Sequence, residues 1–282
     1  MSTKTSVTSR LEGEQMVVAY GEHTVLNGVD FQVPEGELTV ILGPNACGKS
    51  TTLKALARVN PLKEGEVRLD GTPLPQMKSR AIAKILAMLP QTPEAPSGVT
   101  VADVVARGRY PHQSLLRSWS EDDEQACVEA MKAANVLELA ERPIEALSGG
   151  QRQRVWIAMT LAQQTPLILL DEPTTYLDIT HQIEVLNLTK KLHAEGRTVA
   201  VVLHDLNLAF RYATHVVLMK QGRIIAQGDP RAIITPELIQ EVFDLQSIII
   251  PDPCTGTPLV IPKEHQDIHI AADAISAARE SE

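Results

Sequence analysis

The sequence has few cysteines, few aromatic residues and no long uncharged apolar run. Three of its 282 residues are cysteine and 3% are aromatic. Cysteines as widely spaced as Cys47, Cys127 and Cys254 make neither a disulfide framework nor a zinc site, which favours a reducing cytosol. The longest charge-free apolar stretch, residues 155–170, is interrupted by QQTP and is shorter than the roughly 20 apolar residues of a bilayer span. The N-terminal residues MSTKTSVTSR lack the apolar region of a secretory signal, so we expect no membrane-spanning segment.

An excess of basic residues is also absent. The formal net charge is −9 and the pI is about 5.4. Proteins that coat nucleic acid neutralise phosphates with clustered Lys and Arg, so this balance argues against a nucleic-acid partner. The hydrophobic fraction of 44% and the charged fraction of 22% are ordinary for a globular protein, and the length suits a large α/β domain with a subdomain.

The apolar pattern predicts an α/β fold with a mostly parallel sheet. Residues 167–172 and 198–204 are near-continuous apolar runs, which is typical of parallel strands covered on both faces. Residues 37–43 are a further strand-like run that leads into a glycine-rich loop. Residues 92–164 show helical patterns and no obvious strand, so we predict a helical insertion in the core. Early strand-like runs and an Asp70-Gly71 turn indicate an antiparallel β-subdomain.

We therefore expect the chain to be divided into six segments. They are a disordered N-terminus (1–13), a discontinuous nucleotide-binding core (14–91 and 165–246), a helical subdomain (92–164), a C-terminal β-element (247–262) and a polar tail (263–282).

The segment Gly43–Thr51, GPNACGKST, fits the pattern of a phosphate-binding loop. It follows a predicted strand and precedes a predicted helix, which is the context that this motif requires. Its glycines let successive N–H groups face one point, where the helix N-terminus adds positive potential. Lys49 is expected to reach the terminal phosphates of a nucleotide, and the Ser50 hydroxyl to bind Mg²⁺. The loop residues predicted to contact ATP are Gly43, Pro44, Asn45, Ala46, Cys47, Gly48, Lys49, Ser50 and Thr51.

Two acids end the apolar run LILLDE. Asp171 suits the Mg²⁺-binding acid of a P-loop enzyme, at the carboxyl end of a buried strand. Glu172 is expected to point elsewhere and to act as the general base for an attacking water. Acids commonly end strands, but the phosphate loop in the same chain favours the functional interpretation.

Three further residues are candidates for the same site. His204 ends the next apolar run and is expected to contact the γ-phosphate or the water. Gln91 fits the same sheet edge as a contact to Mg²⁺ or water. Tyr20 precedes the loop and is a candidate for stacking on adenine, with an ordinary strand aromatic as an equal alternative.

A second glycine loop, LSGGQ at residues 147–151, opens another predicted helix. Ser148 and Gln151 form the capping pattern S-x-x-Q, and Gly149 and Gly150 leave backbone N–H groups open to an anion. Because two glycines lower helix propensity, a plain helix cap would be better built without them. This loop lies on the helical insertion, away from Lys49. We therefore predict that two copies of the chain pack about a twofold axis, each loop covering the other's nucleotide.

With these motifs in the same order and spacing, the chain resembles the nucleotide-binding subunits of ABC transporters. The matching segments are GPNACGKST, Gln91, LSGGQ, LILLDE, TYLD and His204. The resemblance implies ATP sandwiched between the phosphate loop of one subunit and the LSGGQ of the other. It assigns nucleotide contacts to Ser148, Gly149, Gly150 and Gln151, and a contact across the dimer to Asp178.

Residues 14–262 are similar, more narrowly, to the ATPase subunits of bacterial iron–siderophore importers. Segments such as TTYLDITHQIEVL and IIIPDPCTGTPLVIP carry this resemblance. It implies a homodimeric ATPase on the cytoplasmic face of the bacterial inner membrane. It also implies two integral-membrane permease subunits and, indirectly, a substrate-binding protein as partners. In this branch Cys47 is expected to be a small buried side chain, open to alkylation without ATP.

Other functions remain open at this stage. Relatives in the same branch import haem or vitamin B12. A soluble ABC-type ATPase of DNA repair or translation would share the motifs, but such chains usually carry coiled coils or two cassettes. A small-molecule phosphotransferase would share only the phosphate loop and has no use for LSGGQ. The tail after Lys263 is a candidate regulatory module.

Overall fold

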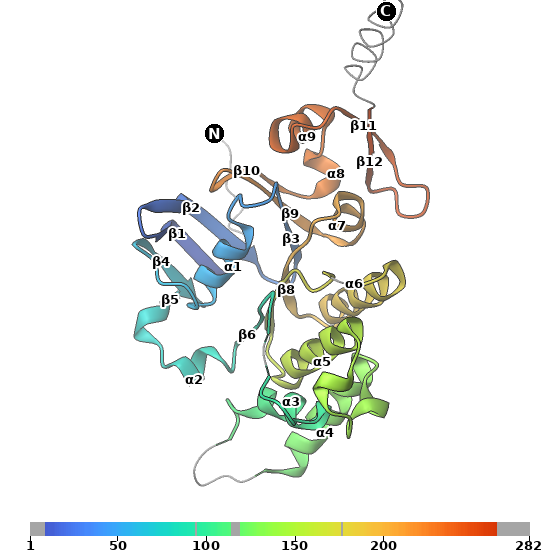
Figure 1. Ribbon diagram of the computed structural model, residues 1–282. Helices are drawn as coiled ribbons and strands as arrows, with labels where there is room; N and C mark the ends of the chain where they lie inside the picture. The colour runs from blue at the N-terminus through green and yellow to red at the C-terminus, as the bar shows by residue number, and fades with distance from the viewer. Residues whose placement is uncertain (1–8, 94, 114–118, 176, 264–282) are drawn as a thin grey trace, which may run out of the picture.

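The computed structural model describes residues 9–93, 95–113, 119–175 and 177–263. A central twisted sheet separates an antiparallel sheet from a group of helices, and a small hairpin lies near the C-terminal end (Figure 1). Among the described residues, no helix is both long and apolar enough to cross a bilayer.

The central sheet has six strands in the order β10-β9-β3-β8-β7-β6. Five of them run parallel and β10 is antiparallel to β9. Every residue of β3, β7 and β8 is buried, which confirms the interpretation of the apolar runs as strands covered on both faces. The strands are β3 (Leu38–Leu42), β6 (Leu86–Leu89), β7 (Leu167–Asp171), β8 (Thr198–Val202), β9 (His215–Lys220) and β10 (Arg223–Gly228).

The antiparallel sheet has the order β2-β1-β4-β5. Its strands are β1 (Ser9–Tyr20), β2 (His23–Pro34), β4 (Glu64–Leu69) and β5 (Thr72–Pro73). The prediction of disorder up to residue 13 is wrong for residues 9–13, which pair with β2 on one side and β4 on the other. Leu11 is fully buried there and Arg10 forms an ion pair with Asp70 at 2.9 Å. These contacts are made with segments distant in the sequence, so the polar local sequence of residues 9–13 does not by itself indicate a strand. Residues 1–8 lie outside the described part.

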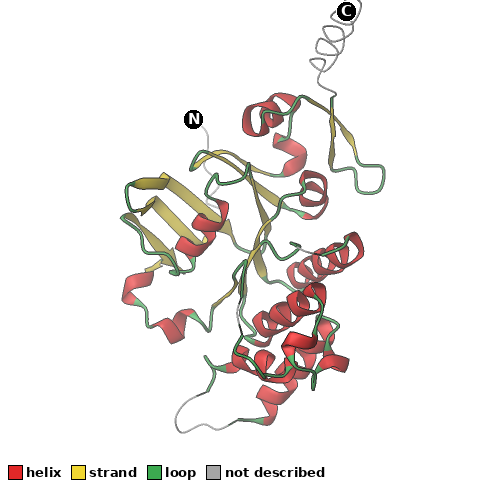
Figure 2. Ribbon diagram, in the orientation of Figure 1, coloured by secondary structure: helices red, strands yellow, loops and turns green. Residues whose placement is uncertain are grey.

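The described residues between 92 and 164 form helices and turns, together with one isolated bridge between Thr100 and Pro143. The α-helices here are α3 (Val101–Ala106), α4 (Glu121–Ala133) and α5 (Gly149–Ala162), and we call this region the helical unit. It forms the cluster of helices at the lower end of the view in Figure 2. Inside it, buried Arg109 donates to buried Asp123 at 2.9 Å and to the carbonyl of Ala162 at 2.7 Å.

The remaining helices surround the central sheet. They are α1 (Lys49–Leu56), α2 (Ser79–Ile82), α6 (Ile179–Ala194), α7 (Leu206–Tyr212), α8 (Pro230–Ile233) and α9 (Pro236–Phe243). The helix α2 ends at Ile82, and Leu86–Leu89 further along the chain pair with β7 as strand β6.

Two apolar cores lie on opposite faces of the central sheet. One fills the space toward α1 and the antiparallel sheet and contains Phe31, Leu53 and Val202. The other joins the opposite face to α6, α7 and the helical unit, and it contains Trp156 and Phe210. The helical unit thus shares its core with the sheet.

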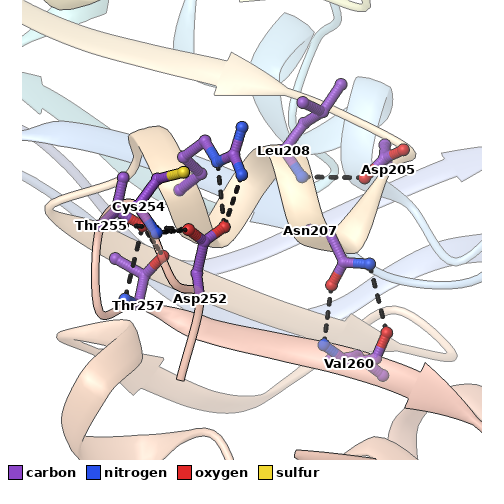
Figure 3. Close-up of polar contacts among 9 residues, drawn as sticks. Asp205, Asn207, Leu208, Asp252, Cys254, Thr255, Thr257 and Val260 are labelled. Atoms are coloured by element: carbon purple, nitrogen blue, oxygen red, sulfur yellow. Dashed lines mark hydrogen bonds and ion pairs between the residues drawn. The ribbon is translucent and has the colours of Figure 1, made fainter. Parts of the chain in front are cut away.

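The C-terminal hairpin, β11 (Ser247–Pro251) and β12 (Pro258–Pro262), is attached to α7 by side chains. The Asn207 amide makes two hydrogen bonds with the Val260 backbone, and Asp252 accepts from the amides of Cys254 and Thr255 (Figure 3). Arg211 also donates to Asp252 at 2.6 Å, and together these groups lower the pKa of the Asp252 carboxyl.

We expect Asp252→Ala to loosen the hairpin from α7. The substitution leaves two backbone amides and the Arg211 guanidinium without their acceptor, and orphaned donors are costly. The amides of β12 should exchange faster with solvent, and the midpoint of thermal unfolding should fall. Because folding lowers the pKa of Asp252, its contribution is present above the ordinary carboxyl pKa and is lost as the pH falls. Unchanged exchange in β12 would contradict this attachment.

Candidate functional site

The phosphate loop connects β3 to α1, as the sequence predicts, and its glycines are required by geometry. Gly43 has φ of +156° and Gly48 has φ of +104°. A Cβ on Gly43 would collide with the carbonyl oxygen of Met219 and the Sγ of Cys47, and one on Gly48 would lie 2.8 Å from Leu26. The loop therefore needs glycine at both positions, for the close approach of its neighbours and for its backbone conformation.

Lys49 is buried inside this loop. Its Nζ donates to the carbonyl oxygens of Gly43 at 2.8 Å and Pro44 at 2.9 Å. Carbonyl oxygens accept hydrogen bonds from the Lys49 ammonium group but carry no net charge, so the positive charge of Lys49 is not neutralised. A buried positive charge beside the open start of α1 makes the loop suited to bind an anion such as a phosphate.

A cavity of about 350 Å³ opens over the loop and gathers residues from several elements. Its lining consists of His23, Val25, Asn45, Ala46, Cys47, Gly48, Lys49, Ser50, Thr51, Glu172 and His204. Glu172 and His204 come from the carboxyl ends of β7 and β8, so the structure brings these predicted residues to the loop. His23 and Val25 of β2 are additions that the sequence does not predict, since only the pairing of β2 within the antiparallel sheet places them there.

Tyr20 lies outside this lining. Its side chain is exposed, and its hydroxyl accepts a hydrogen bond from the Asn60 amide at 2.6 Å. Stacking of Tyr20 on adenine therefore stays a prediction.

Asp171 is completely buried at the end of β7, beside the loop. Ser50 Oγ donates to its Oδ1 at 2.7 Å, and Lys54 Nζ lies 3.8 Å from its Oδ2. The Oδ2 atom has no hydrogen-bond donor within the described part of the chain. An orphaned carboxylate oxygen next to a serine hydroxyl is a hard oxygen donor set, so Ser50 and Asp171 fit a Mg²⁺ ion that also binds phosphate.

Burial raises the pKa of the Asp171 carboxyl, against the hydrogen bond from Ser50 and the charge of Lys54. A carboxyl with a raised folded pKa holds its proton more tightly in the folded state, so stability falls as the pH rises through that range. We expect Asp171→Asn to raise the thermal midpoint of the nucleotide-free, Mg²⁺-free protein at neutral pH. The gain should shrink in acid, where the wild-type carboxyl is protonated. Thermal scans across pH check this, and a lower midpoint at neutral pH would contradict it.

The Glu172 carboxylate is held by three side chains. His204 Nε2 lies 2.8 Å from Oε1, Gln91 Nε2 donates to Oε2 at 2.7 Å, and Thr175 Oγ1 donates to Oε2 at 3.2 Å. The structure thus assembles three predicted residues, Gln91, Glu172 and His204, and adds Thr175. An oriented carboxylate at the cavity wall can accept a proton from a water molecule.

The second glycine loop forms the predicted helix cap at the start of α5. Ser148 Oγ accepts from the Gln151 amide at 3.2 Å, and Gln151 Oε1 accepts from the Ser148 amide at 3.1 Å. Ser148 and Gly149 are exposed, and a Cβ on Gly149 would meet nothing within 4 Å. Residues 147–151 are absent from the lining of the phosphate-loop cavity. One copy of the chain therefore does not bring the two loops together.

Asp178 caps the start of α6. Its Oδ1 accepts from the His181 amide at 2.9 Å and lies 2.8 Å from the His181 ring nitrogen Nδ1. The backbone hydrogen bond from His181 is the main reason that the pKa of Asp178 is lowered. The carboxylate is exposed, and the preceding residue, Leu177, lies close to Gly150 of the second loop. Tyr176 of the TYLD segment lies outside the described residues.

Comparisons with known proteins agree with this geometry. Residues 26–175 match the ABC transporter family. The ferric enterobactin transport ATP-binding protein FepC of Escherichia coli (strain K12) is 48% identical over 259 residues, 92% of this chain and 96% of that protein. The Bacillus subtilis (strain 168) protein named "Probable siderophore transport system ATP-binding protein YusV" is 49% identical over 255 residues, 90% and 93% of the two chains. The dimeric structure of MJ0796, a bacterial ABC transporter cassette, is 29% identical with a TM-score of 0.69, and the match covers 77% of this chain and 97% of that one.

Proposed function

The chain belongs to the ABC transporter family, and we propose that it is the ATP-hydrolysing subunit of a bacterial importer of iron–siderophore complexes. The family match and the phosphate-loop cavity support the ATPase activity. The substrate class is supported by the names of the two relatives described above, which match this chain over nine-tenths of its length.

The triphosphate of ATP lies in the phosphate-loop cavity. Lys49 and the loop amides bind its oxygens, and Glu172, held by Gln91 and His204, accepts the proton of the attacking water. The water oxygen forms a bond to the γ-phosphorus while the bond to the bridging β–γ oxygen breaks, which releases ADP and phosphate. Ser50, Asp171 and Gln91 would hold Mg²⁺, which neutralises phosphate charge when bound.

A complete site requires a second copy of the chain. The observation that carries this proposal is the exposed start of α5, with Ser148 and Gly149 open to solvent, Gly150 half-buried, and all three outside the Lys49 cavity. Backbone N–H groups at a helix start are a ready site for phosphate oxygens. In a twofold dimer each chain places this helix start, and Asp178 beside it, on the nucleotide of the other. The structural relative MJ0796, which is described as dimeric, supports a dimer of this chain.

The dimer acts from the cytoplasmic face of the inner membrane on two permease subunits, which receive substrate from a binding protein. Binding of ATP closes the two copies and hydrolysis opens them, a rigid-body switch biased by ligand. The helical unit, joined to Glu172 through Gln91, is the part proposed to contact the permease.

Uptake of radiolabelled ferric siderophore by cells tests this function. Cells that lack the chain should lose uptake, and the wild-type chain but not Glu172→Gln should restore it. Loss of haem or vitamin B12 uptake with normal siderophore uptake would instead assign the other substrates. A soluble ABC-type ATPase would leave every uptake unchanged, and co-expressed permease subunits would not alter its turnover.

A further inference from the structure

The helix α5 contacts the loop that follows Glu172. Gln153 lies one helical turn after Gly149, and its Nε2 donates to the carbonyl oxygen of Pro173 at 3.2 Å. Residues four apart lie on the same helix face. One end of α5 therefore presents the exposed amides of the second loop and also holds the backbone beside the general base.

The backbone at Glu172 needs such support. Glu172 has φ of +53°, a left-handed conformation that is unfavourable for a residue with a side chain. Pro173 follows Glu172 and further restricts the backbone conformation of Glu172. Proline also has no backbone N–H that could donate a hydrogen bond within the loop. Inside the loop, the Thr175 amide donates to the Glu172 carbonyl at 3.3 Å, and Gln153 satisfies the next carbonyl from outside. The conformation that aims Glu172 into the cavity is thus held partly by α5.

A second contact joins the same two segments. A Cβ built on Gly150 would lie 3.3 Å from Leu177 Cδ2, so the first turn of α5 packs closely against the end of the loop. The Gln182 amide, from α6, donates to the Leu177 carbonyl at 3.0 Å. A displacement of the first turn of α5 therefore reaches the loop at two points, Pro173 and Leu177.

We propose that Gln153 is a positioning residue that couples the two half-sites held by one chain. The inference rests on the proposed function, in which the α5 start and Glu172 of one chain serve different ATP molecules. When Ser148 to Gly150 bind the nucleotide on the partner, α5 takes a fixed place, and Gln153 fixes the Pro173 carbonyl and with it Glu172. Hydrolysis in one site thereby depends on ATP in the other.

The test is Gln153→Met in the full-length protein, because methionine keeps the length of the side chain and removes the donor. We expect kcat to fall about tenfold, which corresponds to about 1.4 kcal/mol in activation free energy, because Glu172 is then less well placed to accept the proton of the attacking water. The KM for ATP should stay within about twofold, since Gln153 contacts no nucleotide. The Hill coefficient for ATP should fall toward one, because the sites no longer depend on each other.

The matched control is Glu184→Gln. It weakens the ion pair from Arg154, the neighbour of Gln153 on α5, to α6 at 3.2 Å and leaves the Pro173 contact intact. It should keep the wild-type kcat and Hill coefficient. A merely structural role for Gln153 predicts a lower thermal midpoint with unchanged cooperativity, and that result would overturn the proposal, as would wild-type kinetics.

Failure of this inference is separable from failure of the proposed function. Two measurements test the proposed function without Gln153 variants: ATP turnover by the wild-type protein, and ATP-dependent dimerisation of the Glu172→Gln variant. If both give the expected result, the kinetics of Gln153→Met test only the coupling between the two ATP sites. The double variant Gln153→Met, Glu172→Gln should still dimerise in ATP, because the nucleotide contacts remain. Its failure to dimerise would show that Gln153 supports assembly and not the coupling.

Discussion

Replacement of Lys49 by alanine should weaken ATP binding on the order of 10²–10⁴-fold, since removing one partner of a buried charge pair costs about 3–5 kcal/mol. Lys49 is buried in the phosphate loop and its donors already face inward, toward the carbonyls of Gly43 and Pro44. A triphosphate placed in that loop loses its main positive contact in the variant. Isothermal titration with ATP measures the change directly, and turnover should disappear with binding at ordinary ATP concentrations.

The control for this experiment is Lys63→Ala. Lys63 is exposed and lies outside the cavity lining, so its loss changes the net charge equally without touching the loop. Because Lys49→Ala also leaves two loop carbonyls without a donor, a thermal scan should accompany the titration to show that the variant is folded. Wild-type affinity for ATP in a folded Lys49→Ala protein would rule out this cavity as the nucleotide site.

Glu172→Gln should reduce ATP turnover by about 10²–10⁴-fold, the usual contribution of a general base, while ATP still binds. The amide matches the carboxylate in shape, so it can keep the place held by Gln91, Thr175 and His204. It cannot accept the proton of the attacking water, and it removes a negative charge close to the phosphates. The ATP-bound dimer should therefore form and persist, and sizing in excess ATP and Mg²⁺ should show twice the monomer mass.

Glu195→Gln serves as the matched control, since it makes the same chemical change at an exposed position at the end of α6. That variant should turn over ATP normally and elute as the wild type does. A Glu172→Gln protein that stays monomeric in ATP, both alone and with its permease subunits, would refute the sandwich arrangement. Turnover close to the wild-type rate would instead remove Glu172 from the role of base.

Much of the candidate site could be predicted from the sequence because its parts are locally encoded. The phosphate loop needs glycines at Gly43 and Gly48 for backbone reasons, and the structure gives both a positive φ. The helix cap at Ser148 depends on residues three apart, and both of its hydrogen bonds form as the spacing predicts. Strands β7 and β8 are apolar apart from Asp171 and Thr198, because they are covered on both faces.

Other features were not predictable in this way, because they depend on contacts between distant segments. The strand pairing of residues 9–13 is set by β2 and β4, and their own polar sequence suggests disorder. The side-chain amide of Gln163, the residue that follows α5, donates to the carbonyl of Leu86, a contact across 77 residues that no local pattern predicts.

The sequence by itself determined the local chemistry: which backbone turns are suited to an anion, which acid ends a buried strand and where α1 and α5 begin. Only the tertiary structure decided which side chains from distant segments come into contact. It brought His23 and Val25 to the phosphate loop, added Thr175 to the groups that hold Glu172, and placed the Gln153 amide against the Pro173 carbonyl. The physical reason is that turns and helix caps are fixed by hydrogen bonds between residues close in the sequence. The long-range contacts follow instead from the packing of whole sheets and helices.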